Sequence, residues 1–273
     1  MSNLKPPAPV GNVVQRKKVA MNLLQAWLLL LTFADGLLPT SVLASVCEAP
    51  DLAYRNWTIT SQAQLDALSE CTTLDGTLLI RHSYEGPFVL RNVQNITGTI
   101  RAFSFERGLR PKVTSIELPD LLYMDWSYTD MPTLTKFSAP KLISAGEIEI
   151  NRPTAGSTVD LGSLTSVKQH LQLVGDFSSI NLNSLRNASI LTICNNRCTT
   201  SPEWDDAMAQ ELDIDLPALE TAGRLSIGGN ISRFVLAIST VATAASGRAE
   251  WILIMFLASR HLDCKPSPRM ARF

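Results

Sequence analysis

The stretch Ile116-Glu117-Leu118-Pro119-Asp120-Leu121-Leu122-Tyr123-Met124 carries a pattern that returns along the middle of the chain. Apolar residues stand two positions before Leu118, three after it and six after it. The pattern recurs at a period of 21–22 residues, with longer gaps before the second copy and before the sixth. The residues equivalent to Leu118 are Leu90, Ala139, Leu161, Leu182 and Leu216. A fixed period of this length is typical of a solenoid.

Each copy contains a second, alternating pair of apolar residues. These pairs are Ile100 and Ala102, Trp126 and Tyr128, Ile148 and Ile150, Leu171 and Leu173, Leu191 and Ile193, and Leu225 and Ile227. A period of two predicts a strand, so each copy holds two short strands joined by turns. One coil cannot bury its own apolar residues, but stacked coils join them into columns. We therefore expect a mainly β fold, a right-handed β-helix or leucine-rich solenoid over residues 45–232, rather than a sandwich of unrelated strands.

Both irregular parts of this solenoid contain cysteines. Cys47 and Cys71 flank a short helix predicted from Ser61, and a disulfide between them would close the N-terminal end. The wide gap before the last copy holds Cys194 and Cys198 and a second predicted helix, from about 202 to 212. We expect a packed helical insertion stapled by a Cys194–Cys198 disulfide.

The N-terminal segment 1–44 resembles a secretory signal peptide. A cationic patch at Arg16–Lys18 precedes the apolar run 23–31, and Met21 is an alternative start. Pro39 helps to interrupt the apolar sequence, which is too short for the roughly 20 residues of a spanning helix. We therefore favour a cleaved signal over a membrane anchor.

Paired cysteines and glycosylation sequons agree with export. Disulfides persist in oxidising compartments outside the cytosol. Sequons place acceptor asparagines at four positions: Asn56, Asn95, Asn187 and Asn230. Together these features predict a secreted, extracellular or cell-surface glycoprotein.

Three stretches carry a family resemblance, at residues 59–68, 71–80 and 216–227. They resemble the fungal GPI-anchored cell-wall organisation proteins and their sporulation-specific relatives, whose repeats are similar to receptor L domains. The resemblance covers roughly residues 47–232. It implies a non-catalytic role in wall organisation at the cell surface, with wall polysaccharide or wall glycoproteins as partners and no catalytic residues.

The C-terminal segment departs from that family. Residues 233–273 contain neither a Ser/Thr-rich stalk nor a hydrophobic extreme C-terminus, because Lys265, Arg269 and Arg272 lie near the end. We expect an atypical, poorly ordered tail without a GPI signal. Membrane contact would then come only through the signal peptide or through a lost anchor.

Composition and motifs give little support to other functions. Only 18% of residues are charged and the net charge is -1, without a basic stripe for nucleic acid. The histidines His82, His170 and His261 are scattered, and Cys194 and Cys198 have no neighbouring ligands for zinc. We expect no cofactor, no metal site and no catalytic centre.

One enzymatic alternative is a β-helix polysaccharide hydrolase or lyase. Glu117, Asp160 and Asp215 fall in one polar column, where paired carboxylates could attack a glycan. Ser138 and Asn181 separate them, so we interpret this column as a solvated polar ladder. Glu147 and Glu149 are likewise expected to face outward beside inward apolar residues.

Another alternative is a glycan- or protein-binding module of the L-domain type. Tyr123, Trp126, Tyr128 and Met131 cluster in one copy and could form a contact patch. The alternation in this copy favours Trp126 and Tyr128 as core residues instead.

Overall fold

The computed structural model describes residues 45–51, 53–102, 109–195 and 210–236. Predictions for the signal peptide, for Cys198, for most of the helix at 202–212 and for the tail beyond residue 236 lie outside these ranges. Within the described residues, no helix combines the length and the apolar character needed to cross a membrane.

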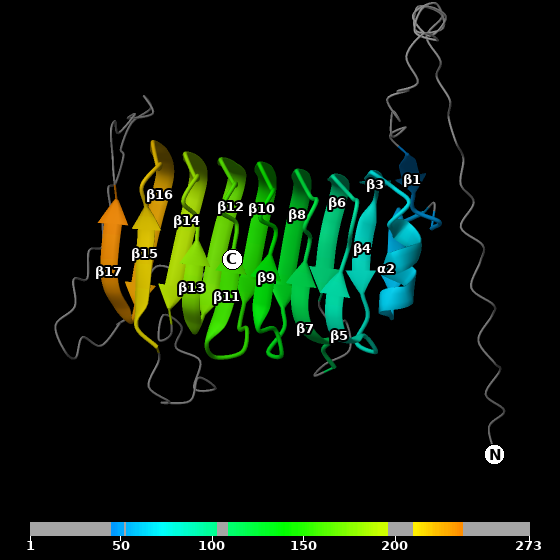
Figure 1. The fold of residues 1–273 in the computed structure, drawn as a ribbon, viewed down its shortest axis with the longest axis horizontal. Helices are drawn as coiled ribbons and strands as arrows, with labels where there is room; N and C mark the ends of the chain where they lie inside the picture. Colours follow the sequence, from blue (N-terminus) through cyan, green and yellow to red (C-terminus); the bar gives the residue numbers. More distant parts are fainter. Residues whose placement is uncertain (1–44, 52, 103–108, 196–209, 237–273) are drawn as a thin grey trace, which may run out of the picture.

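The chain forms a stack of parallel β-coils, with each coil contributing one strand to a large sheet and most contributing one to a smaller sheet (Figure 1). The large sheet has ten strands: β1 (Val46–Glu48), β2 (Asn56–Ile59), β3 (Thr73–Asp75), β4 (Thr77–Ile80), β6 (Asn95–Ala102), β8 (Tyr123–Asp130), β10 (Ser144–Asn151), β12 (Ser166–Gly175), β14 (Asn187–Asn195) and β16 (Thr221–Gly229). The small sheet has five: β5 (Glu85–Val89), β7 (Lys112–Glu117), β9 (Lys136–Ser138), β11 (Ser157–Asp160) and β13 (Phe177–Asn181). A separate pair joins β15 (Leu212–Leu216) to β17 (Ile231–Leu236). The predicted mainly β fold is confirmed, and its parallel sheets are consistent with a solenoid.

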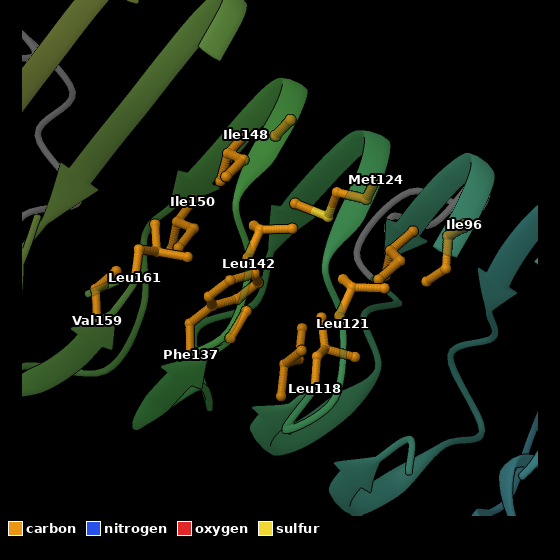
Figure 2. Packing of buried hydrophobic residues seen from close by; sticks show 14 of the residues in the cluster. Ile96, Leu118, Leu121, Met124, Phe137, Leu142, Ile148, Ile150, Val159 and Leu161 are labelled. Carbon is orange, nitrogen blue, oxygen red and sulfur yellow. The ribbon is translucent and has the colours of Figure 1, made fainter. Parts of the chain in front are cut away.

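The apolar columns predicted from the repeat form the core between the two sheets. Leu118 and its equivalents form one column, which we call the reference column. Each of its members is at most 1% exposed: Leu90, Leu118, Ala139, Leu161, Leu182 and Leu216. Figure 2 shows side chains of successive coils, among them Leu118, Phe137 and Leu142, gathered in the interior between the strands. Burial of apolar surface at roughly 25 cal/mol per Å² is the main stabilising term in such a stack.

The reference residue also marks the turn from the small sheet to the large one. The backbone N–H of Leu121 donates to the carbonyl of Leu118 at 3.3 Å, and Leu142 donates to Ala139 at 3.1 Å in the next coil. The backbone N–H of Leu118 donates to the carbonyl of Ser138 in the next coil at 2.8 Å. Each coil is thereby tied to its neighbour at the corner.

The N-terminal end is closed as predicted by a helix and a disulfide. Helix α2 (Gln62–Leu68) packs Leu65 and Leu68 into the core, and the backbone N–H of Ser61 donates to Gln64 Oε1 at 3.3 Å. A disulfide joins Cys47 to Cys71. A partial copy of the repeat at residues 74–80 forms β3 and β4, and the sequence did not reveal that β1 and β2 add a further layer beyond it.

One expectation about the core is wrong. In β8, Ser127 and Thr129 are fully buried, whereas Trp126 is 43% exposed and Tyr128 is half-buried. Ser127 lies beside Ile148 of β10, and Trp126 lies beside Glu147. The register with β10 therefore turns the two aromatic side chains to the outer face.

The C-terminal end of the described stack also differs from expectation. Leu212, assigned by sequence to a helix, is the first residue of β15. Strand β17 continues the regular structure to Leu236, four residues past the expected domain boundary at 232. Buried Asn195 holds this region, because its Nδ2 donates to the carbonyls of Gln210 and Asn230 at 2.8 and 3.0 Å.

Candidate binding face on the large sheet

The polar column considered for catalysis is occupied by contacts between coils. Glu117 forms an ion pair with Lys136 at 3.0 Å, and this hydrogen bond lowers the pKa of the Glu117 carboxyl. Asp160 Oδ1 accepts a hydrogen bond from Asn181 Nδ2 at 2.9 Å. These side chains connect neighbouring coils, which supports the interpretation of a polar ladder.

Asp215, the third carboxylate of that column, lies outside the small sheet that contains Glu117 and Asp160. Asp215 belongs to β15, in the separate two-stranded sheet, and pairs with Arg233 of β17 at 2.8 Å. The structure therefore does not place Asp215 in one sheet with Glu117 and Asp160.

A different group of chemically capable side chains gathers on the outer face of the large sheet. The register places Trp126 beside Glu147, and Glu149 lies between Tyr128 and Gln172. His170 of β12 lies across from Glu147, because Ile148 and Leu171 are lateral neighbours. This outer-face group is Trp126, Tyr128, Glu147, Glu149, His170 and Gln172.

The two glutamates and the histidine are close enough to act together. The closest ligand-type atoms of Glu147, Glu149 and His170 all lie within 4.8 Å of one another. The pKa of Glu147 is raised, and burial is the largest cause. The side-chain hydrogen bond to Glu149 and the negative charge of Glu149 raise it further. Burial and the neighbouring Glu149 therefore both favour the protonated form of Glu147.

His170 is oriented by contacts on both sides of its ring. Nε2 lies 3.2 Å from Thr192 Oγ1, and Nδ1 lies 4.0 Å from Glu147 Oε1. The pKa of His170 is lowered, and burial is the largest cause. The negative charge of Glu147 opposes this shift, and the positive charge of Arg224 adds to it. The imidazole is therefore favoured in its neutral form, with ring nitrogens that can donate or accept.

Tyr128 and Gln172 both lie among other polar side chains of the same face. Burial raises the pKa of the Tyr128 hydroxyl, and Asp130 and Glu149 raise it further. Gln172 Nε2 donates to Asn151 Oδ1 at 2.9 Å. The outer face thus presents aromatic surface next to ordered hydrogen-bonding groups.

A shallow depression of about 240 Å³ adjoins this group at the start of the same strands. Its lining comes from four consecutive coils: Asn95, Ile96, Thr97, Tyr123, Met124, Asp125, Ser144, Ala145, Gly146 and Lys168. Tyr123 is 49% exposed, so the contact patch proposed from sequence retains Tyr123, Trp126 and Tyr128. Met131 does not belong to it, because its side chain is fully buried.

The predicted modification residues lie at separate places on the stack. Asn187 and Asn230 are exposed, whereas Asn56 and Asn95 are half-buried in β2 and β6. Asn187 Oδ1 accepts a hydrogen bond from Thr221 Oγ1 at 2.7 Å. Cys194 is disulfide-bonded, and its expected partner lies outside the described residues. Glycosylation at the four asparagines stays a prediction.

Comparison with known proteins identifies a distant, partial relative. The chain is 29% identical over 174 residues to protein ecm33 of Aspergillus fumigatus. The alignment covers 55% of the chain and 42% of the relative, so the chain spans less than half of that protein. No family model matches the chain, and no solved structure matches it.

Proposed function

We propose that the chain is a secreted or cell-surface protein that contributes without catalysis to the organisation of a fungal cell wall. The similarity to protein ecm33 of Aspergillus fumigatus carries this proposal. The signal-like segment, the sequons and the Cys47–Cys71 disulfide support export. The stacked parallel coils support a solenoid of the receptor L-domain type, with a rigid, extended surface for wall components.

Fractionation of fungal cells that express an epitope-tagged chain tests the localisation. We expect the tag in the wall and medium fractions, on a species whose mobility increases after treatment with an N-glycosidase. A variant with Gln at Asn56, Asn95, Asn187 and Asn230 is the matched control for this shift. Retention of an unglycosylated full-length chain in the cytosol would contradict export.

A second candidate function is binding of wall polysaccharide by the outer-face group. Trp126 and Tyr128 supply aromatic faces for sugar rings, and Glu149 and Gln172 supply hydrogen-bonding groups between the same coils. This arrangement favours a glycan over a protein partner, because polar groups flank the aromatic surface directly. Its partners would be wall polysaccharides or the glycans of wall glycoproteins.

Sedimentation with insoluble wall glucan and chitin tests this second function. We expect Trp126→Ala to raise the dissociation constant about tenfold, by the loss of roughly 1.5 kcal/mol of contact energy. Trp57→Phe, in the buried N-terminal end, is the control aromatic substitution away from this face. Equal binding by the wild type and Trp126→Ala would contradict the assignment.

The hydrolase or lyase alternative has less support in the geometry. Glu117 and Asp160 serve contacts between coils, and Glu147 and Glu149 share a hydrogen bond. A retaining glycosidase separates its carboxyl groups by about 5–5.5 Å so that a sugar carbon fits between them. Release of soluble sugar from wall glucan, lost in Asp160→Asn, would establish the enzyme and overturn the non-catalytic proposal.

A further inference from the structure

The outer face of β10 and β12 contains three donor groups that converge from adjacent coils. Among the described residues, Glu147, Glu149 and His170 are the set of three acidic, histidine or cysteine side chains whose donor atoms approach within 4.8 Å. Glu147 and Glu149 alternate around inward Ile148, so both carboxylates leave the same face of the strand. His170 joins them from the neighbouring strand.

The spacing between His170 and Glu147 is that of a long ion pair without a direct hydrogen bond. The 4.0 Å between Nδ1 and Glu147 Oε1 exceeds the range of a hydrogen bond. Two ligand atoms that share a tetrahedral zinc ion at 2.0–2.2 Å lie about 3.3–3.6 Å apart. Side-chain rotations that close the group by about an ångström would bring the three donors around one ion.

The second ring nitrogen gives an independent indication of how the imidazole is held. Nε2 lies 3.2 Å from Thr192 Oγ1 on β14, the next strand along. When Nε2 carries the proton, it donates to this hydroxyl, and the Nδ1 lone pair then faces the two carboxylates. Metal-binding histidines are oriented in this way, with the other ring nitrogen fixed by a neighbouring group.

We propose that Glu147, Glu149 and His170 form a binding site for a divalent transition-metal ion of the zinc type. One imidazole nitrogen with carboxylate oxygens suits such ions, whereas calcium and magnesium favour oxygen ligands alone. The side chains of Glu147 and His170 are 15% and 23% exposed. One side of the site therefore stays open for water or for an oxygen of an exogenous ligand.

A dication requires ionised carboxylates and a neutral imidazole as its ligands. The site shares Glu149 with the proposed glycan-binding group, but it rests on the geometry of these coils and not on the proposed wall function.

Titration of the EDTA-treated full chain with Zn²⁺ in a calorimeter tests the site, with Co²⁺ absorption spectra as a second readout. We expect one saturable site in the wild type. His170→Gln, Glu147→Gln and Glu149→Gln should each weaken Zn²⁺ binding at least about tenfold. Thr192→Val should weaken it through loss of the imidazole orientation, by about 10–100-fold.

His82→Gln and Glu220→Gln are matched controls, since both side chains lie in other parts of the stack and should leave binding unchanged. Glu147→Gln and Glu149→Gln should unfold at urea concentrations no lower than the wild type, because each removes one carboxylate from the adjacent pair. Unchanged Zn²⁺ affinity in His170→Gln, or no saturable site in the wild type, would overturn the proposal.

Discussion

At the scale of single residues, the alternation in β8 was the hardest feature to predict. The sequence offers Trp126 and Tyr128 as the apolar pair, yet Ser127 and Thr129 face the core. The spacing alone did not reveal this. Ile148 follows its reference residue by nine positions and Leu171 follows its own by ten, yet both are fully buried. Register shifts within the large-sheet strands absorb such differences, so the pairing with β10 decides where the aromatic side chains lie.

The two buried hydroxyl groups of β8 differ in their partners, which gives a first prediction. Thr129 Oγ1 donates to the carbonyl of Glu149 at 3.1 Å, whereas Ser127 Oγ is buried with no hydrogen-bond partner among the described residues. Ser127→Ala should therefore leave the free energy of unfolding unchanged or raise it by up to about 1 kcal/mol. Thr129→Val should lower it by about 1 kcal/mol. Urea unfolding of both variants measures the contrast, and equal losses would contradict it.

Tyr84 predicts how stability depends on alkaline pH. Burial, and then the charge of Asp66, raise the pKa of Tyr84 to about 12, and its hydroxyl donates to the carbonyl of Pro87 at 2.7 Å. In the unfolded chain the tyrosine pKa is about 10. The folded state holds this proton more tightly, so the contribution is complete below pH 10 and is lost as pH rises toward 12.

Thermal unfolding between pH 9 and 12 measures this effect. Tyr84→Phe should unfold at a lower temperature than the wild type at pH 9, but its melting temperature should fall less steeply above pH 10. The slope will not vanish, because burial also raises the pKa of Tyr128. Tyr54→Phe, at a 79% exposed position, should retain the wild-type slope. Parallel slopes for Tyr84→Phe and the wild type would contradict the assignment.

At the scale of strands and turns, the repeat predicted most of what is observed. The reference column, the turn after it and the cap helix at Ser61 all follow from local sequence. The extra strands β1 and β2 were missed because the segment 46–59 lacks the full repeat. The convergence of Glu147, Glu149 and His170 depends on the register between coils, which a local pattern does not specify.

Gly146 lies where the register between β10 and β12 shifts, between Ala145 and Ile148, and it shows how closely the coils approach there. A Cβ atom at this position would clash with the backbone carbonyl oxygen of Asp125 in the preceding coil. Backbone cannot move aside as a flexible side chain can. Gly146→Ala should therefore lower the free energy of unfolding by about 1–3 kcal/mol, the usual cost of overpacking.

Urea unfolding of Gly146→Ala checks this prediction against a matched glycine. Gly86 has open space where a Cβ would stand, but its φ of +95° strains any other residue. Gly86→Ala therefore reports backbone strain without a clash between coils. A Gly146→Ala variant as stable as the wild type would show that the coils separate there without cost.

At the scale of the whole molecule, stacking makes each coil interact mainly with its two neighbours. The lateral partners of a core residue repeat its chemistry. Leu171 lies between Ile148 and Leu191, and Leu173 lies between Ile150 and Ile193. Removing one complete coil would therefore bring aliphatic residues against aliphatic residues. Removing half a coil would instead align a small-sheet strand of one coil with a large-sheet strand of the next.

Deletion of residues 162–182, which joins Leu161 to Asn183, removes one complete coil of 21 residues. We expect the shortened chain to retain β-sheet circular dichroism and cooperative urea unfolding, at a lower midpoint because one buried layer is lost. Deletion of residues 162–172 should abolish cooperative unfolding, since it removes fewer residues but breaks the alternation of the sheets. The complete deletion also removes His170 and sets Ile190 beside Glu147, so it should fold without the Zn²⁺ site. A shortened chain that loses its fold entirely would mean that coil 162–182 is not interchangeable with its neighbours, and that the stack depends on contacts specific to it.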